Sequence, residues 1–284
     1  MRRSTRPFLA AGLLGVLIGA PQIVGLAQSS GSGSVITRFT GTWKEDVSKR
    51  TVGALVDLRF QRGANGTLQE LRGPDVRPDI QTVVFDGKPH KLENGTSSIT
   101  WKQPSPNTFE RVIADDRAIL TVRRIQISAD GKTLTEETER KATDGRRDVD
   151  TIVFQRISGD QGLVGRWKAQ SFKTNNPAVV KYEPAGTNGI KFSNANNLPT
   201  DTTYTVAFDG KPVEVIGRTT VDGTMTAAKR LDDRTIEFTN SREGVVSGTS
   251  VRQVSADGRT LTVTYTTVGP NANAGPSVSV YVKQ

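Results

Sequence analysis

The chain has 284 residues, a formal net charge of +9 and no cysteine. Without thiols it cannot form disulfides, thiolate metal sites, a cysteine nucleophile or the acylated cysteine of a lipoprotein. Acidic and basic residues are interspersed along the chain instead of clustering, so we expect no nucleic-acid partner.

The first twenty-seven residues have the pattern of a secretory signal peptide. Three arginines precede an apolar run over residues 8–20, and small residues follow at 25–27. The alternative is an uncleaved anchor, but a spanning helix needs roughly 20 apolar residues. We expect cleavage after Ala27, a periplasmic or secreted product, and no stable membrane insertion. Loss of the three arginines changes the net charge from +9 to +6 (9 − 3 = 6).

Residues 28–36 begin with a stretch rich in serine and glycine and predict a flexible leader. Beyond the leader, short runs of Val, Ile, Thr, Phe and Tyr are broken repeatedly by Gly, Pro, Asn and Asp. No long apolar pattern with the 3.6-residue period of a helix occurs. The predicted fold class is therefore all-β and antiparallel.

One structural unit occurs twice in the chain. The phrase TVVFDGKP at 82–89 returns as TVAFDGKP at 205–212, and SADGKTLT at 128–135 returns as SADGRTLT at 255–262. Solenoid and propeller repeats are only roughly 20 to 50 residues long, so each copy is expected to be a domain with its own core. We predict a first domain over 37–158 and a second over 159–284.

Asp-Gly pairs predict the hairpin tips. Asp130-Gly131 and Asp257-Gly258 lie between alternating runs, which is typical of a type I′ turn.

The repeated phrase predicts a strand that ends in a tight turn. Alternation along this strand directs four apolar side chains to one face, and we expect them to border a cavity: Val83, Phe85, Val206 and Phe208.

Each copy begins with a Gly-x-Trp-Lys motif, at Gly41 to Lys44 and at Gly165 to Lys168. This start, combined with a late Ser-x-Asp-Gly-Lys-Thr-Leu-Thr hairpin, resembles the lipocalin-like domains (calycin superfamily) of small exported bacterial proteins. The resemblance implies two tandem antiparallel barrels, each with an interior cavity. It also implies that a last-strand cation packs on the first-strand tryptophan and closes the barrel. The implied pairs are Trp43 with Arg156 and Trp167 with Lys283.

Few residues offer catalytic chemistry. His90 is the only histidine and follows a Gly-Lys-Pro turn, where an exposed imidazole is expected. Glu110 and Glu237 match between the copies but lie in different domains. They therefore fit outward cross-strand charge partners better than the paired carboxylates of a glycosidase.

Two pairs of adjacent acids, Asp115-Asp116 and Asp232-Asp233, are interpreted as solvated loop residues. Adjacent strand residues point to opposite faces, and no calcium loop with ligands at alternate positions is present. We predict no catalytic residue, no metal and no cofactor.

Three hypotheses of function follow. The first is an exported, non-catalytic protein that binds a small apolar or amphipathic ligand in a barrel cavity. The second is a lipid- or carotenoid-modifying enzyme on the same tandem scaffold, and the third is a structural or interaction domain of the cell envelope with filled barrels. An apolar cavity would favour the first, carboxylates together with Tyr or His the second, and filled barrels the third.

Overall fold

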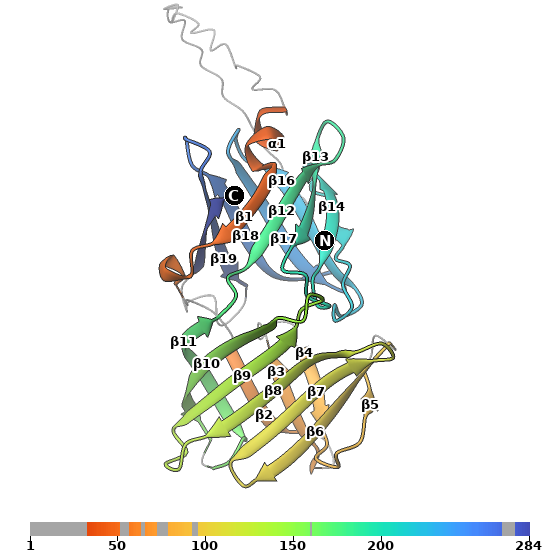
Figure 1. The fold of residues 1–284 in the computed structure, drawn as a ribbon, viewed down its shortest axis with the longest axis vertical. Helices are drawn as coiled ribbons and strands as arrows, with labels where there is room; N and C mark the ends of the chain where they lie inside the picture. Colours follow the sequence, from red (N-terminus) through yellow and green to blue (C-terminus); the bar gives the residue numbers. More distant parts are fainter. Residues whose placement is uncertain are drawn as a thin grey trace, which may run out of the picture. The chain divides into compact units, whose positions relative to one another are not determined.

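The computed structural model describes residues 33–51, 57–63, 66–72, 79–92, 96–159, 161–268 and 276–284. The expected signal peptide and the first part of the expected leader lie outside the described residues. The described chain forms two ten-stranded antiparallel sheets, which confirms the all-β fold class (Figure 1).

The first sheet, which we call barrel 1, has the strand order β4-β3-β2-β11-β10-β9-β8-β7-β6-β5. Its strands are β2 (Asp57–Arg62), β3 (Leu68–Arg72), β4 (Asp79–Val83), β5 (His90–Lys91), β6 (Ser97–Ser105), β7 (Thr108–Asp115), β8 (Ile119–Ile127), β9 (Thr133–Lys141), β10 (Arg147–Ser158) and β11 (Gly165–Thr174).

The second sheet, barrel 2, has the order β14-β13-β12-β1-β20-β19-β18-β17-β16-β15. Its strands are β1 (Gly41–Glu45), β12 (Val179–Pro184), β13 (Gly189–Asn194), β14 (Thr203–Ala207), β15 (Val213–Glu214), β16 (Thr224–Arg230), β17 (Thr235–Arg242), β18 (Val245–Val254), β19 (Thr260–Thr267) and β20 (Ser277–Lys283). A short 3-10 helix, η1 (Val47–Lys49), follows β1.

The two sheets exchange their first strands. Strand β1, from the head of the first copy, pairs with β12 and β20 of barrel 2. Strand β11, from the head of the second copy, pairs with β2 and β10 of barrel 1. Figure 1 shows β1, in orange, beside the green β12. The predicted boundary at 158/159 is wrong for both head strands, so that barrel 1 extends to Thr174.

The physical reason is the nearly identical pattern of the two head strands. Each carries Gly-x-Trp-Lys, so each offers a sheet the same inward tryptophan, and the pattern alone does not select a sheet. Strand β10 ends at Ser158 and β11 begins at Gly165, so a short connection places them side by side as sequential strands usually lie.

The exchange also changes the partners of the tryptophans. The Arg156 guanidinium lies 4.0 Å from the ring centroid of Trp167, and Lys283 Nζ lies 5.0 Å from that of Trp43. The implied pairs Trp43 with Arg156 and Trp167 with Lys283 are therefore wrong, because each cation packs on the other tryptophan. Both indoles are fully buried, and each donates its Nε1 hydrogen to a backbone carbonyl four residues earlier, at 2.8 Å for Trp43 and 3.0 Å for Trp167.

A short helix, α1 (Gly33–Phe39), precedes β1. Its side chains Val35, Ile36 and Phe39 are buried in the core of barrel 2. The Phe39 ring meets Tyr182 edge-on, with 5.6 Å between the centroids. The expectation of a flexible leader is therefore wrong over 33–36, because α1 begins at Gly33 and the barrel buries Val35 and Ile36.

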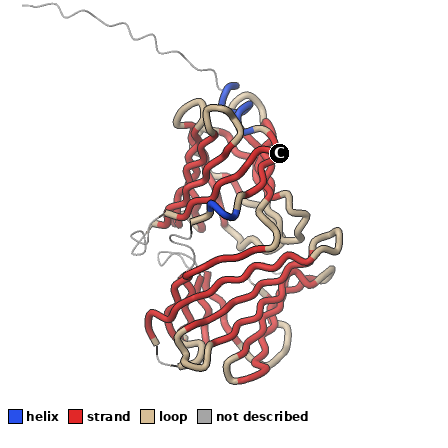
Figure 2. Tube along the Cα trace, turned by 60° about the vertical axis from the view of Figure 1, so that its left-hand side comes forward, coloured by secondary structure: helices blue, strands red, loops and turns tan. Residues whose placement is uncertain are grey.

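The sheets differ in how far they close. In barrel 2, Thr203 and Ile216 bring the two sheet ends together through backbone hydrogen bonds of 2.8 and 2.9 Å. In barrel 1, no ladder pair joins β4 to β5, the two ends of the sheet, among the described residues. The segment between them is held to β6 by a hydrogen bond from Gly87 N to Trp101 O at 3.1 Å. One sheet is thus a nearly closed barrel and the other is more open, and Figure 2 traces the strands of each.

The Asp-Gly pairs form hairpin tips as predicted, between β8 and β9 and between β18 and β19. The predicted type I′ turn is wrong, because positive φ angles occur at Gly131 (69°) and Gly258 (73°) but not at the preceding aspartates. Asp130 instead accepts a hydrogen bond from Lys132 N at 3.0 Å, and Asp257 accepts one from Arg259 N at 3.1 Å. The carboxylate bonds let each aspartate keep an ordinary backbone conformation.

The strand exchange can be tested with introduced cysteines, because the chain has none of its own. Thr42 lies opposite Lys181 across β1 and β12. Paired antiparallel residues have Cα atoms about 4.5 to 5.5 Å apart, within the range of a disulfide. We therefore expect the variant Thr42→Cys/Lys181→Cys to form an intrachain disulfide, measured by non-reducing electrophoresis and peptide mapping.

The matched control is Thr42→Cys/Arg59→Cys. Arg59 lies opposite Arg166, which holds in β11 the place that Thr42 holds in β1. This second pair would be bridged only if β1 lay in its own copy's sheet. Cross-linking of the control pair but not of the first pair would contradict the exchange.

Candidate functional site

Five charged side chains lie inside barrel 1. Glu70, Arg111, Arg123 and Glu136 are at most 7% exposed, and the Arg72 side chain is 18% exposed. They come from four strands, β3, β7, β8 and β9. Buried charges are costly unless they are paired, so this group is the strongest chemical feature of the interior. We call these five residues the charge cluster.

The two carboxylates of the charge cluster are shared among the guanidinium groups. Glu70 Oε1 accepts hydrogen bonds from Arg123 Nη1 at 2.6 Å and from Arg72 Nε, and Glu70 Oε2 accepts one from Arg111 Nη1 at 3.1 Å. Glu136 accepts a hydrogen bond from Arg72 Nη2 and forms an ion pair of 3.5 Å with Arg123 Nε. Arg72 and Arg123 each contact both carboxylates, whereas the bonds recorded for Arg111 reach Glu70 alone.

Strand alternation places these charges inside. Arg111 shares the buried face of β7 with Phe109 and Ile113, two residues before and two after it. Its neighbour Glu110 points outward and forms an ion pair of 3.7 Å with Arg124, which confirms the expected cross-strand role of Glu110. A charged residue in phase with apolar ones was the sequence signal for the cluster, and our sequence analysis missed it.

The cluster keeps its carboxylates ionised. Burial alone would raise the pKa of Glu70, but the charges of Arg123, Arg72 and Arg111 outweigh burial and hold this pKa far below its usual value. The pKa of Glu136 is likewise lowered, because Arg123 and Arg72 overcome the effect of its burial.

Arg111 is the cation least supported by the cluster. Burial, together with the nearby charge of Arg123, lowers the pKa of Arg111 to about 9, so that the guanidinium still carries its charge at neutral pH. Burial also lowers the pKa of Arg123. The pKa of Arg72 is instead raised, because the attraction of Glu136 and Glu70 outweighs its burial.

The charge cluster borders a cavity of about 400 Å³. The lining also includes apolar side chains and uncharged polar ones. Its described residues are Glu70, Arg72, Gln81, Arg111, Ile113, Thr121, Arg123, Glu136, Thr138, Arg140, Asp150, Ile152, Thr200, Thr219 and Val221. Four buried polar atoms of the described lining residues make no hydrogen bond to another protein group: Arg111 Nε, Arg123 Nε, Gln81 Oε1 and Thr121 Oγ1. Arg123 Nε still has the carboxylate of Glu136 at 3.5 Å, whereas no ion pair involves Arg111 Nε among the described residues. Such atoms are rare in native proteins and call for a partner.

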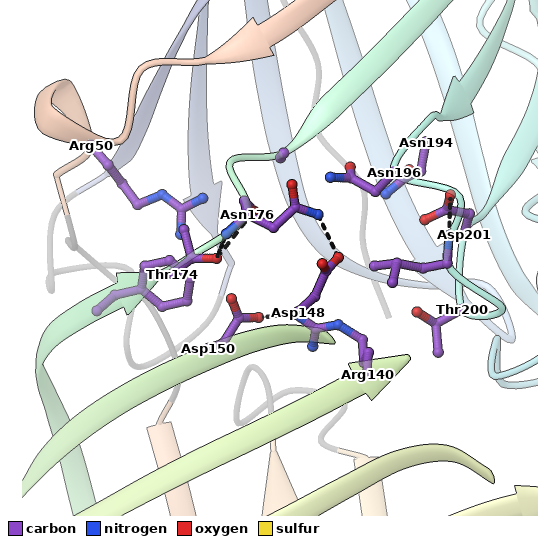
Figure 3. A pocket seen from close by; sticks show the side chains of 13 residues that line it. Arg50, Arg140, Asp148, Asp150, Thr174, Asn176, Asn194, Asn196, Thr200 and Asp201 are labelled. Atoms are coloured by element: carbon purple, nitrogen blue, oxygen red, sulfur yellow. Dashed lines mark hydrogen bonds and ion pairs between the residues drawn. The ribbon is translucent and has the colours of Figure 1, made fainter. Parts of the chain in front are cut away.

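A second, more polar pocket of about 210 Å³ adjoins the ends of β10 and β11 (Figure 3). Asp148 accepts hydrogen bonds there from Asn176 Nδ2 and, at 3.2 Å, from Arg146 Nε. Burial raises the pKa of Asp201, which accepts a hydrogen bond from Leu198 N at 3.0 Å. Among the described residues, no three acids or histidines are grouped as metal ligands. The acids of this pocket thus have protein partners of their own.

Barrel 2 holds uncharged side chains where barrel 1 holds its charges. The repeat shift of 127 residues places Arg111 on Phe238, Arg123 on Ser250 and Glu136 on Val263. Glu70 of β3 lies opposite Gln81 in barrel 1, and the corresponding pair in barrel 2 is Phe192 opposite Tyr204. Phe192 therefore takes the place of Glu70.

Aromatic rings pack against one another in the interior of barrel 2. The Phe192 and Tyr204 rings stack at 4.8 Å, and Tyr204 meets Phe238 at 6.1 Å. The guanidinium of Arg252 lies 3.9 Å from the Phe238 centroid and donates a hydrogen bond to the Tyr182 hydroxyl at 2.8 Å. The barrel fold therefore does not require an Arg–Glu cluster.

The residues predicted to border a cavity lie in the cores instead. Val83, Val206 and Phe208 are buried, and the half-buried Phe85 packs 5.5 Å from Phe109 and 6.0 Å from Trp101. None of these four residues lines either pocket described above.

The other polar residues considered from the sequence have mixed outcomes. His90 is exposed, as expected, and its Nε2 lies 3.1 Å from the Asp86 carboxylate. The interpretation of Asp115 as a solvated acid is wrong, because its side chain is 4% exposed and accepts a hydrogen bond from Arg218 Nε at 2.8 Å. Its neighbour Asp116 is 87% exposed.

Comparison of the chain with protein-family models, with curated proteins and with solved structures finds no match. The likeness to lipocalin-like domains therefore stays a prediction based on the motifs. Within the described part of the chain, no helix has the length and apolar character needed to cross a bilayer.

Replacement of Glu70 tests the energetic role of the cluster. The variant Glu70→Gln leaves three buried guanidinium groups with one carboxylate, which should lower the free energy of unfolding by about 3 to 5 kcal/mol. The control Glu110→Gln removes an outward carboxylate of the same barrel and should cost less than about 1 kcal/mol. Denaturant unfolding at neutral pH measures both losses of free energy. Equal losses in the two variants would contradict the stabilising role of Glu70 in the charge cluster.

The same variants give a pH test. Because the folded-state pKa values of Glu70 and Glu136 are lowered, their contribution to stability is complete above about pH 5 and is lost as the pH falls through the folded values. Wild-type protein should therefore lose stability on acidification, and Glu70→Gln should lose less over the same range. The measurement is denaturant unfolding at each pH. If Glu70→Gln had the same pH dependence as wild-type protein, Glu70 would be excluded as a source of the stability lost on acidification.

Proposed function

We propose that the chain is an exported, non-catalytic binding protein that holds a small amphipathic ligand in the cavity of barrel 1, on a lipocalin-like scaffold. The observation that carries this proposal is the cavity of about 400 Å³, bordered by buried charges and by polar atoms without protein partners. Ligand pockets commonly measure roughly 300 to 1,000 Å³ and combine apolar walls with a few placed polar groups.

The lining supports an amphipathic occupant in preference to a purely apolar one. Ile113, Ile152 and Val221 offer apolar contact, whereas Thr121 and the charge cluster offer hydrogen bonds. A purely apolar ligand would cover these polar atoms without bonding them, which is unfavourable. A ligand with an apolar body and a polar head satisfies both kinds of wall.

Two observations weigh against the enzyme hypothesis for this site. Neither histidine nor tyrosine is among the lining residues. The carboxylates are held ionised by guanidinium groups, and a general acid needs a proton near neutral pH. The cavity therefore offers binding groups without an acid and base pair.

The structural hypothesis suits barrel 2 better than barrel 1. Stacked and edge-on rings of Phe192, Tyr204 and Phe238 occupy its interior. This packing suits barrel 2 to a scaffold role. Its core also includes side chains of α1 and β1.

Calorimetric titration with a small amphipath tests the proposal. We expect at least one eight-carbon compound of the set octanol, octanoate and octylamine to bind the wild-type chain at a single site. Thr121→Phe should abolish this binding by filling the cavity, because Thr121 is a lining residue. The matched control Thr100→Phe changes a β6 residue that is not among the lining residues and should bind normally.

Two results would overturn the proposal: binding of none of the three compounds, or unchanged binding by Thr121→Phe. Native mass spectrometry of the chain purified from its own host adds an independent readout. A co-purifying small molecule that is lost in Thr121→Phe would support the site.

A further inference from the structure

The charge cluster is not balanced. Three guanidinium groups (Arg72, Arg111 and Arg123) face two carboxylates (Glu70 and Glu136), an excess of one positive charge (3 − 2 = 1). Among the described lining residues, the remaining charged pair, Arg140 with Asp150, is neutral in itself. A buried charge without a counter-charge is strongly unfavourable, so the excess calls for an anion.

We infer that the ligand of barrel 1 carries a single oxyanion group and that this group binds at Arg111. The inference rests on the proposed function, because it names the chemical class of the ligand for that same cavity.

The contacts single out Arg111. Arg72 and Arg123 each touch both carboxylates, while the recorded ion pair of Arg111 uses one nitrogen and one oxygen of Glu70, 3.1 Å apart. Arg111 is 6% exposed, and its Nε makes no hydrogen bond to the protein. A guanidinium has five hydrogen-bond donors in a fixed planar fork, which suits a carboxylate or another oxyanion.

Two neighbouring side chains complete an oxyanion site. Thr121 lies opposite Ile113 on the adjacent strand, one inward step from Arg111, and its hydroxyl makes no hydrogen bond to a protein group. Gln81 lies opposite Glu70, and its amide oxygen also lacks a hydrogen-bond partner. The hydroxyl can donate to an anion, as can the amide after exchange of its oxygen and nitrogen positions.

The second copy argues against a purely structural role for Arg111. Its counterpart is Phe238, which packs among aromatic rings in a barrel of the same topology. The fold is therefore maintained when the position is apolar. A charge kept inside barrel 1 at an energetic cost is better explained by ligand binding than by closure of the barrel.

A matched set of eight-carbon probes tests the sign of the charge. Octanoate should bind wild-type protein about tenfold more tightly than octanol, and octylamine should bind more weakly than either, because burial next to Arg111 favours an anion. Octanesulfonate distinguishes a tetrahedral from a planar oxyanion, and a preference for either acid over octanol supports the inference.

The variant Arg111→Met should remove the preference for octanoate over octanol. It should also raise the denaturant midpoint of the ligand-free chain, because the remaining cluster has two cations and two anions. The control Arg124→Met removes one positive charge from the half-exposed outer face of the same barrel and should leave the preference unchanged. Should Arg111→Met fail to fold, Arg111→Lys provides the second variant and should retain a preference for the anion.

The two proposals fail in different ways. Octanol binding as tightly as octanoate would overturn the anion inference and leave the binding function in place. Binding of none of the probes would overturn the binding function itself. A lower denaturant midpoint in Arg111→Met with an unchanged octanoate preference would show that Arg111 is a structural residue.

Discussion

The exchange of the two head strands is the constraint on which the rest of the structure depends. Each sheet takes its Gly-x-Trp-Lys strand from the other copy, and the tryptophan of that strand packs under a cation of the receiving sheet. A cation over an indole contributes about 0.5 to 2 kcal/mol, in addition to the burial of a large ring. Since neither sheet is complete without residues from both copies, the two barrels form one interdependent assembly. The short helix α1 belongs to it as well, because β1 brings the helix into the core of barrel 2.

Within this shared frame, the two interiors have diverged. Barrel 2 buries rings that stack and meet edge-on, while barrel 1 buries ions at the corresponding positions. Apolar packing needs no partner of particular charge, whereas each buried ion needs one in place. A duplicated barrel can thus keep one copy as a scaffold and use the interior of the other for recognition. The sheet in which the charges lie is also the more open of the two.

The sequence predicted those features that depend on local, period-two patterns. The all-β class, the hairpin tips at Gly131 and Gly258 and the outward direction of Glu110 all follow from alternation and turn chemistry. The strand exchange could not be predicted in this way, because Trp43 and Trp167 stand in nearly identical motifs and either strand fits either sheet.

The charge cluster was hidden for a different reason. In the sequence, Arg123-Arg124 is a short basic pair between apolar residues, and only strand pairing shows that Arg123 points inward to Glu70 while Arg124 points outward to Glu110. The turn type was predicted wrongly, because an aspartate can stabilise a turn through side-chain hydrogen bonds without adopting a positive φ angle. Interior polarity is a property of several strands together, whereas the alternation in one strand reports only that strand.

The position of β1 between β12 and β20 has a consequence for the order of folding. The described strands of barrel 1 lie within residues 57–174, so all of them are available once β11 has been synthesised. Strand β1 and its neighbour β20 are far apart in the sequence, since Trp43 lies opposite Lys283, 240 residues later (283 − 43 = 240). Contacts of such large sequence separation form slowly. Strand β1 can pair with β12 before β20 is available, but its other edge stays unpaired until β20 is in place, so barrel 2 is completed later than barrel 1.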